Sequence, residues 1–391
     1  MIPFQDACSI VMKNVRPMLF EKVGCADAAG RILAEAIHSD MDFPPFDRAQ
    51  MDGFAARQQD LAQSLDIIET VPAGKVPTRS VGSRQATRIM TGAPVPEGAD
   101  VVFKVEESRL EEDGQVRFCG PGTEAHIARR GTDLQRGDKV LEPGTLLSAN
   151  HIATLASVGA AEVMVARQPR VAIVATGDEL VEPGILPGPG QIRNASSSTL
   201  QVQTIRAGGV PHYRGICSDR KEHIFAALSS ALADSDVVLM TGGVSMGDFD
   251  LVPELISEAG LEILFDRVAL KPGKPATFAV GEAGVVFGMP GNPVSTFVVF
   301  ELLVRPFLAA CMGVMNPVKE KSVVLGADFR RRRASRLEWI PVLLDEHYRA
   351  FPIPCHGSAH FAALCRADGL VAVPIGVEEL HANQQVTLRV T

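Results

Sequence analysis

The chain has 391 residues, with 38 Lys and Arg against 46 Asp and Glu, so its formal net charge is −8. This acidic balance argues against a general nucleic-acid-binding protein, which needs a basic face. At about 100 to 200 residues per domain, the length predicts two to four domains. The seven cysteines form no C-x-x-C pair, which disfavours a zinc site or a disulfide framework and is typical of a reducing cytoplasm.

The sequence predicts neither a signal peptide nor a membrane-spanning segment. The N-terminus lacks a basic start followed by an apolar run. Residues 297–315 are the longest apolar stretch, but Glu301, Arg305 and Pro306 interrupt it, whereas a spanning helix needs about 20 nearly uninterrupted apolar residues. We therefore expect a cytoplasmic protein in which residues 297–308 form a core helix.

The predicted secondary structure changes twice along the first half of the chain. Residues 4–38 are expected to be helical with a break at Gly24, because apolar residues recur at helical spacing. Short β-like runs separated by turn residues follow over about 60–145 and predict a small β-rich domain. A helix over 149–157 and a strand over 161–165 then lead the chain back toward the first region.

Residues 170–313 alternate between strands and helices, which predicts a doubly wound, mainly parallel α/β sheet. The expected strands are 171–175, 210–216, 237–240 and segments near 261 and 285, and the expected helices are 198–207, 221–233, 251–259 and 293–312. Residues 318–391 again look β-rich and predict a small barrel or sandwich.

Polar residues follow three of the predicted strands, at 176–179, 241–250 and 290–295. In open α/β sheets, ligands bind beyond the carboxyl ends of the strands. Gly242 and Gly243 can bring backbone N–H groups close to an anion, although an ordinary strand-to-helix turn explains them equally well. We therefore expect the binding site at this edge of the sheet.

Charged residues on these loops indicate the chemistry. The carboxylates are Asp178, Glu179, Asp219, Asp248 and Asp250. Their oxygens suit Mg²⁺, although a helix N-cap explains Asp219 equally well. Lys271 and Lys274 suit oxyanions, with a solvated basic turn as the alternative. A cation site beside lysines predicts phosphate-ester or anhydride chemistry. The run of arginines at 330–333 is expected to form a solvated turn.

Six motifs together resemble one known family, the molybdopterin molybdenumtransferases of the MoeA type, which also form the E domain of gephyrin. The motifs are Met51-Asp52-Gly53-Phe54-Ala55, Met90-Thr91-Gly92-Ala93-Pro94-Val95-Pro96, Thr176-Gly177-Asp178-Glu179-Leu180, Thr241-Gly242-Gly243-Val244-Ser245-Met246-Gly247-Asp248, Lys271-Pro272-Gly273-Lys274-Pro275 and Pro290-Gly291-Asn292-Pro293-Val294-Ser295. They follow the family's order, and the resemblance in domain order covers essentially the whole chain.

The resemblance implies a multidomain α/β protein that forms an L-shaped homodimer. Residues 1–44 with 141–168 would form an elongated, helical and extended dimerisation domain, and 45–140 an inserted β-rich domain. Residues 169–317 would form the doubly wound α/β domain that binds the molybdopterin nucleotide, and 318–391 a small β-barrel. The family inserts molybdate into adenylylated molybdopterin while the pyrophosphate link is hydrolysed, releasing AMP.

The resemblance also implies roles for individual residues. Catalytic roles would fall to Asp52, Thr91, Glu179, Asp250, Lys271 and Lys274, with Mg²⁺ held by Glu179, Asp219 and Asp250. Nucleotide, phosphate or molybdate would be bound by Asp178, Asn194, Ser196, Asp219, Gly242, Gly243, Ser245, Asp248, Pro290, Asn292, Arg336 and Ser358. Asp52 and Thr91 would reach the site of the other subunit. Transient contact with other molybdenum cofactor enzymes is a further implication.

The departures from the family pattern lie mostly near the C-terminus. Where the family reads G-R-x-x-F-x-R, this chain keeps the first arginine as Arg336 and has Pro341 in place of the second. Ala359 replaces the second glycine of a G-S-G turn. Two other functions stay open: adenylyl transfer to molybdopterin, which would not need the first 168 residues, and a non-catalytic paralogue that carries the nucleotide or serves as a scaffold.

Overall fold

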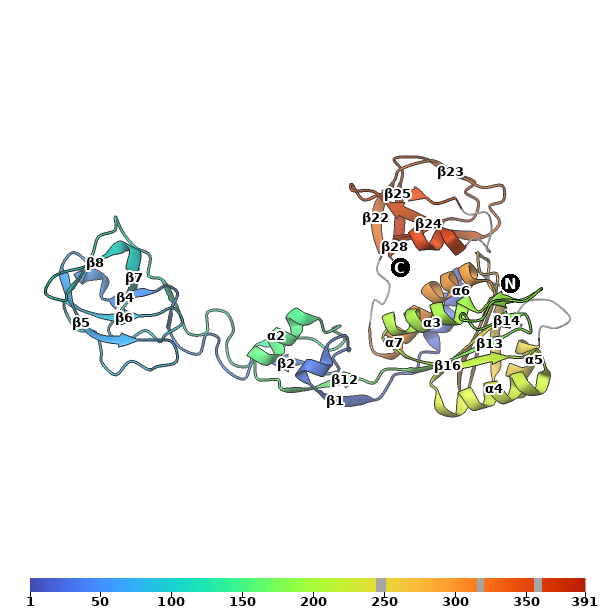
Figure 1. The fold of residues 1–391 in the computed structure, drawn as a ribbon, viewed down its shortest axis with the longest axis horizontal. Coiled ribbons are helices and arrows are strands. Elements are labelled where there is room, and N and C mark those ends of the chain that lie inside the picture. The colour runs from blue at the N-terminus through green and yellow to red at the C-terminus, as the bar shows by residue number, and fades with distance from the viewer. Residues whose placement is uncertain (244–250, 315–319, 355–360, 391) are drawn as a thin grey trace.

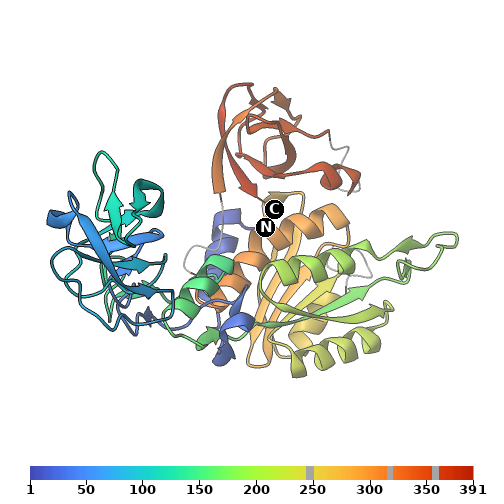
Figure 2. The ribbon, with the colours of Figure 1, turned by 60° about the vertical axis from the view of Figure 1, so that its left-hand side comes forward.

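The computed structural model describes residues 1–243, 251–314, 320–354 and 361–390. The molecule is elongated: a β-rich domain lies at one end, a small domain in the middle, and an α/β domain with a C-terminal barrel at the other end (Figure 1). Turned by 60°, the barrel still lies beside the α/β domain (Figure 2). The multidomain α/β architecture expected from the sequence is therefore confirmed.

The α/β domain contains a six-stranded sheet in the order β16-β13-β17-β21-β20-β18. Five strands share one direction, and β20 runs antiparallel to its neighbours β21 and β18. This confirms the doubly wound, mainly parallel sheet, although β20 was not predicted. The strands are β13 (Arg170–Thr176), β16 (Val210–Cys217), β17 (Val237–Thr241), β18 (Glu262–Arg267), β20 (Pro275–Gly281) and β21 (Gly284–Met289).

Helices cover both faces of this sheet because its strands bury both sets of alternating side chains. Val237 and Leu239 of β17 point into one core, and Val238 and Met240 into the other. The first core lies under α1, α3, α6 and α7, and the second under α4 and α5. The helices are α1 (Phe4–Lys13), α3 (Ala195–Arg206), α4 (Lys221–Asp234), α5 (Val252–Glu258), α6 (Pro293–Val299) and α7 (Arg305–Cys311).

A π-helical turn, η4 (Phe300–Val304), joins α6 and α7 into one long helix. Pro306 has no N–H to donate within this helix, and such local widening is a common way to accommodate a proline. Residues Pro293–Cys311 are long and apolar enough to cross a membrane, but 78 % of that window is buried inside the structure. The core-helix interpretation is confirmed.

The middle domain is built from segments far apart in the sequence. Strand β1 (Phe20–Gly24) pairs antiparallel with β12 (Glu162–Ala166), and β2 (Ile37–His38) pairs with β11 (Lys139–Leu141). Helix α2 (Ala149–Ser157) agrees with its prediction, and η1 (Cys25–Ala28) completes the domain. The predicted helix over 4–38 is wrong beyond Lys13, because Pro17 interrupts it and the following residues pair with β12.

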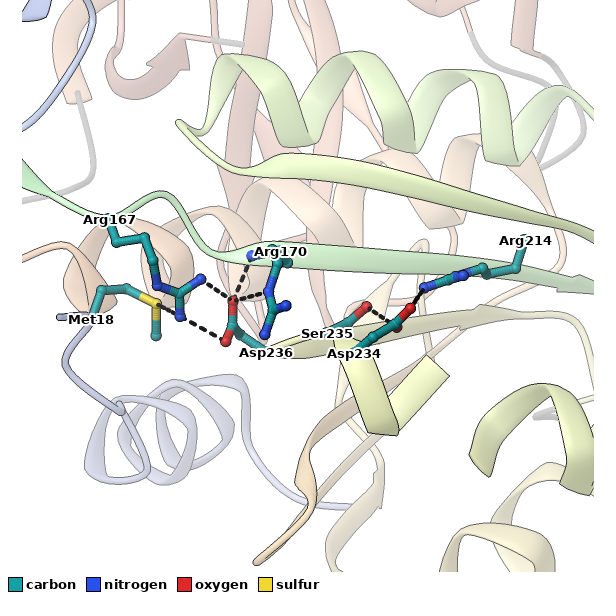
Figure 3. A network of polar contacts seen from close by, with 7 residues as sticks. All are labelled: Met18, Arg167, Arg170, Arg214, Asp234, Ser235 and Asp236. Carbon is teal, nitrogen blue, oxygen red and sulfur yellow. Dashed lines mark hydrogen bonds and ion pairs between the residues drawn. The ribbon is translucent and has the colours of Figure 1, made fainter. Parts of the chain in front are cut away.

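The joint between the middle and α/β domains is centred on Asp236, which directly precedes β17 (Figure 3). Arg167 donates two hydrogen bonds to its carboxylate, at 2.8 and 3.0 Å, and the backbone N–H of Arg170 donates a third at 2.7 Å. Met18, on the other crossing segment, accepts from Arg167 through its sulfur. Both chain segments that cross the joint therefore meet near one partly buried carboxylate.

The inserted domain has a sheet in the order β7-β4-β6-β5-β9-β8. Its strands are β4 (Gly53–Ala56), β5 (Ser64–Val71), β6 (Gln85–Ile89), β7 (Val101–Lys104), β8 (Ser108–Leu110) and β9 (Val116–Phe118), with the short helices η2 (Gln58–Asp60) and η3 (Val105–Glu107). Strand β3 (Arg48–Ala49) pairs with β10 (Ile127–Ala128) where the chain enters and leaves the domain. The prediction that this domain is rich in β-strands is confirmed.

The C-terminal domain is a closed barrel of five strands in the order β24-β25-β22-β28-β26, and β26 pairs back with β24. It is therefore a barrel and not a sandwich. Strand β19 (Leu270–Lys271) extends this sheet from the α/β domain by pairing with β24. The strands are β22 (Glu320–Leu325), β24 (Leu337–Leu344), β25 (Arg349–Pro352), β26 (Gly369–Val373) and β28 (Gln385–Val390). Smaller elements are β14 (Leu180–Val181), β15 (Ile192–Arg193), β23 (Phe329–Arg330), β27 (Glu379–Leu380) and η5 (Phe361–Arg366).

Candidate active site

The carboxyl ends of three neighbouring strands meet at one edge of the α/β sheet. Gly242, after β17, donates a backbone hydrogen bond to the Met289 carbonyl at the end of β21 (3.3 Å). Ser196 Oγ, at the start of α3, donates to the Gly291 carbonyl at 3.3 Å. The loops that the sequence singled out are therefore in contact.

Asp178 and Asp219 face each other at this edge. The backbone N–H of Asp178 donates to Asp219 Oδ2 at 3.3 Å, and that of Asp219 donates to Asp178 Oδ1 at 3.2 Å. The Glu179 carboxylate lies over Gly177, where a Cβ atom would come within 2.6 Å of it. Three carboxylates thus lie on adjacent loops, but among the described residues only Asp328, Glu379 and His381 bring three ligand atoms within 4.8 Å of one another.

The electrostatic potential at this edge of the sheet is negative. Burial raises the pKa of the Cys217 thiol, at the end of β16, and the charges of Asp219 and Asp178 raise it further. A cation bound between these loops would offset the repulsion between the carboxylates. The electrostatics therefore agree with the oxygen donors in favouring a cation.

Two of the predicted ligand-binding asparagines cap helices. Asn194 is buried, accepts from the backbone N–H of Ser197 at 3.1 Å, and donates to the Tyr213 hydroxyl at 2.9 Å. Asn292 accepts from the backbone N–H of Val294 at 3.2 Å. Both side chains cap the start of a helix next to the strand-end loops, so they hold these loops in place through bonds inside the protein.

The Gly242 position tests how tightly the strand-end loops are packed. Its φ is +90°, and a Cβ there would lie 2.3 Å from the Thr176 carbonyl oxygen. Gly242→Ala is expected to lower the free energy of unfolding by about 3 kcal/mol, because strain at positive φ adds to a backbone clash. Gly215→Ala is the matched control, since Gly215 has φ +89° with open space around its Cβ position. Equal losses in a denaturant titration would show that the loops are loosely packed.

A cavity of about 570 Å³ lies between the α/β domain and the barrel. Five predicted site residues line it: Lys271, Lys274, Pro290, Asn292 and Arg336. Residues 290–292 also belong to the strand-end edge, so the cavity and the edge share one wall. The two lysines that the sequence assigned to oxyanions and the strand-end carboxylates therefore lie in neighbouring parts of the structure.

Glu338 and Trp339 also line the cavity, and the sequence did not single them out. Glu338 Oε1 lies 2.8 Å from Lys271 Nζ, and Arg336 donates to the Leu270 carbonyl at 3.1 Å. The only signal for Glu338 was its place two residues after Arg336, a spacing that puts two side chains on one face of an extended segment. The ion pair between Glu338 and Lys271 could not be predicted, because it depends on how the barrel packs against the Lys271 loop.

The run of arginines behind this wall is only partly solvated. Arg332 and Arg333 are exposed, as expected. The Arg331 side chain is only 2 % exposed and contacts Glu338 Oε2 at 3.3 Å. The expected solvated turn is therefore wrong for Arg331, because the Glu338 carboxylate and backbone carbonyls supply its partners inside the barrel.

Asp52 and Thr91 lie in the inserted domain, at the opposite end of the molecule from the cavity (Figure 1). Asp52 Oδ1 accepts from both the backbone N–H and the hydroxyl of Thr91, each at 2.7 Å. These bonds lower the pKa of the Asp52 carboxyl below its usual value, and both residues are exposed. The pair is organised but does not reach the cavity of its own chain. Four other predicted site residues, Ser245, Asp248, Asp250 and Ser358, lie outside the described residues.

Family models match the chain in three consecutive parts. They are the MoeA N-terminal region (domain I and II) at residues 2–159, a probable molybdopterin binding domain at 172–310, and the MoeA C-terminal region (domain IV) at 322–390. The resemblance inferred from the six motifs is confirmed.

Curated relatives and solved structures agree with these models. The chain is 38 % identical to the molybdopterin molybdenumtransferase of Bacillus subtilis, over 98 % of this chain and 93 % of that protein. It is 34 % identical to the enzyme of the same name from Staphylococcus aureus strain Mu50, over 100 % and 96 %. A solved molybdopterin biosynthesis MoeA protein from Pyrococcus horikoshii superposes with a TM-score of 0.85 at 30 % identity, covering both chains fully.

Proposed function

Because the chain belongs to the MoeA family of molybdopterin molybdenumtransferases, we propose that it inserts molybdate into adenylylated molybdopterin in molybdenum cofactor biosynthesis. The reaction hydrolyses the pyrophosphate link in the presence of Mg²⁺ and releases AMP. The observation that carries the proposal is the wall shared by the carboxylate edge and the cationic cavity. One substrate can therefore present its phosphates to one side and its dithiolene to the other.

The strand-end edge binds the nucleotide part of the substrate in this proposal. Gly243 presents its backbone N–H group to the phosphates, while Gly242, whose N–H is bonded to the Met289 carbonyl, lets the loop pass close to them. Glu179 and Asp219, together with Asp250, would hold Mg²⁺, which when bound neutralises charge on the pyrophosphate. The Asp178–Asp219 contact keeps the two loops in register for this purpose.

The cavity binds the oxyanion. Lys271, Lys274 and Arg336 carry positive charge on its wall, and a tetrahedral dianion such as molybdate needs several donors of this kind. Arg336 is anchored through the Leu270 carbonyl, so its guanidinium is held at the entrance to the Lys271 loop. The remaining volume leaves room for the reacting end of the pterin substrate.

We further propose that the protein is a homodimer whose sites are completed by Asp52 and Thr91 of the other subunit. The α/β sheet ends at β16, an edge strand that pairs with β13 alone among the described strands. Beside it, α3 exposes Val202 and Ile205, and the neighbouring crossing segment exposes Leu19 and Phe20. A second copy that covers this apolar surface would place its inserted domain on a different α/β domain from its own. Transient contacts with other molybdenum cofactor enzymes and a cytoplasmic location belong to the same proposal.

Charged substitutions on α3 test the dimer. Val202→Glu with Ile205→Glu is expected to give a monomer in light scattering, because two carboxylates would have to be buried at the interface. Thr199→Glu, at a partly exposed position on the same helix, is the matched control and should keep the oligomeric state. If the double variant is still a dimer, the interface lies on another surface of the molecule.

AMP release from adenylylated molybdopterin tests the activity. Purified protein is assayed with and without molybdate and Mg²⁺, beside Asp250→Ala and the control Asp266→Ala, an exposed carboxylate on β18. We expect release that depends on both ions and is lost only in the Asp250 variant. Nucleotide binding without release would support the carrier or scaffold function, and formation of adenylylated molybdopterin from ATP would support adenylyl transfer.

A further inference from the structure

The cavity wall carries one negative charge among its positive ones. Lys271, Lys274 and Arg336 are its cations, and Glu338 is the single carboxylate among the described residues that line it. A carboxylate is unfavourable next to a bound anion, since like charges repel more strongly where water is excluded. Glu338 therefore needs an explanation beyond the general preference of oxyanions for basic pockets.

Glu338 is held rigidly. Its backbone lies opposite Lys271 in the β19–β24 pairing, and its Oε1 contacts Lys271 Nζ at 2.8 Å. Its other oxygen contacts Arg331, which also donates to the carbonyls of Val377 and Arg336 at 2.7 and 3.0 Å. The Glu338 side chain is 11 % exposed, whereas that of Lys271 is 46 % exposed. Arg331 thus holds one oxygen of the Glu338 carboxylate, and the other oxygen contacts Lys271.

This geometry limits what Lys271 can offer a ligand. An ammonium group has three hydrogen-bond donors, and one of them is directed to Glu338. The others remain for an oxyanion, which must share the lysine with a carboxylate. Lys274, on the same loop, forms no ion pair with a described residue, so the two lysines are not equivalent.

We propose that Glu338 is a positioning and specificity residue that directs Lys271 and weakens the cavity's affinity for oxyanions, so that the bound dianion can be passed on to the substrate. The inference rests on the proposed function, because it takes the ligand to be a tetrahedral oxyanion. A merely structural Glu338 would join β24 to the Lys271 loop without affecting how anion binding depends on charge.

Direct binding of molybdate alone tests the proposal, with sulfate as a second probe. The full chain contains a single tryptophan, Trp339, and this residue lines the cavity. Its fluorescence, supported by calorimetry, reports binding without any need for turnover. Glu338→Gln keeps the size and an acceptor oxygen for Arg331, and we expect it to bind molybdate about tenfold more tightly at low ionic strength, with a steeper salt dependence. Glu379→Gln is the matched control, since Glu379 pairs with Arg330 elsewhere in the barrel, and should bind as the wild type does.

The outcomes separate the inference from the proposed function. Binding by the wild type that Arg336→Gln abolishes, together with unchanged or weaker binding by Glu338→Gln, would overturn the role of Glu338 and leave the oxyanion site standing. If the wild type does not bind molybdate, both the role of Glu338 and the proposed oxyanion site are wrong. If the Gln variant does not fold, Lys271→Gln is compared with Lys274→Gln. The Lys271 variant should lose more affinity because it also leaves Glu338 facing the anion, and an equal or smaller loss would contradict the proposal.

Discussion

Mixing two inactive variants is expected to restore activity if the site is shared between subunits. Asp52→Ala and Arg336→Ala each remove one side of the proposed site, and each homodimer should lose molybdate-dependent AMP release. A mixed dimer contains one site with both residues intact and one site that lacks both. With random exchange of subunits in a symmetric dimer, about a quarter of the wild-type activity should return. The measurement is AMP release after the two purified variants are unfolded and refolded together.

The complementation has a direct control. Lys271→Ala with Arg336→Ala removes two residues of the same cavity wall, so no mixed dimer of these two variants holds an intact site. This mixture should stay inactive. Recovery in the control, or none with Asp52→Ala, would place Asp52 outside the partner's site, and its exposed pair with Thr91 would then need another role.

Loss of the Asp236 carboxylate is expected to have the largest effect on stability among exchanges at the domain joint. Asp236→Ala removes two hydrogen bonds from Arg167 and one from the Arg170 backbone, and leaves a partly buried guanidinium without its partner. We expect a loss of about 2 to 3 kcal/mol in the free energy of unfolding in a denaturant titration. Asp234→Ala is the matched control: Asp234 pairs with Arg214 nearby but is half exposed, so its loss should matter little (Figure 3).

The Asp236 contribution also has a defined pH dependence. Burial alone would raise the pKa of this carboxyl, but the hydrogen bonds from Arg167 and Arg170 lower it below its usual value. A carboxyl whose pKa is lower in the folded state stabilises the protein above its unfolded pKa of about 3.9, and this contribution disappears as the pH falls through the folded pKa. The stability difference between wild type and Asp236→Ala should therefore be constant near neutral pH and shrink below about pH 4. A difference that grew on acidification would contradict the assignment.

Local sequence signals predicted much of the fold. The limits of α2 agree because the helical pattern at 149–157 is bounded by turn residues, and β17 was recognisable as a short apolar run before Gly242. The errors arose where partners are distant in sequence. Residues 20–24 pair with 162–166, so no local pattern distinguishes this strand from a helix with similar spacing. Strand β20 begins at a proline and was hidden by the lysine loop before it.

The site was predictable to the extent that it follows from topology. Asp178 and Asp219 follow adjacent parallel strands, so their proximity could be inferred before any coordinates. The closing of the cavity by the barrel could not, because it depends on how residues 336–341 dock on the loop at 270–275. Glu338 was missed for that reason. The buried Arg331 side chain was missed because its partners come from distant parts of the barrel sequence, such as Val377.

The β1–β12 ribbon ties together the two chain segments that lead from the α/β domain into the middle domain. Two antiparallel strands in register bend easily across their flat face but resist sliding past each other, because sliding would break every ladder hydrogen bond at once. Val163 and Val165 of β12 also pack into the core of the middle domain, so the ribbon is a fixed part of that domain. The two chain segments that lead from the α/β domain are thereby tied together over five residue pairs, and neither can shift along its axis without the other.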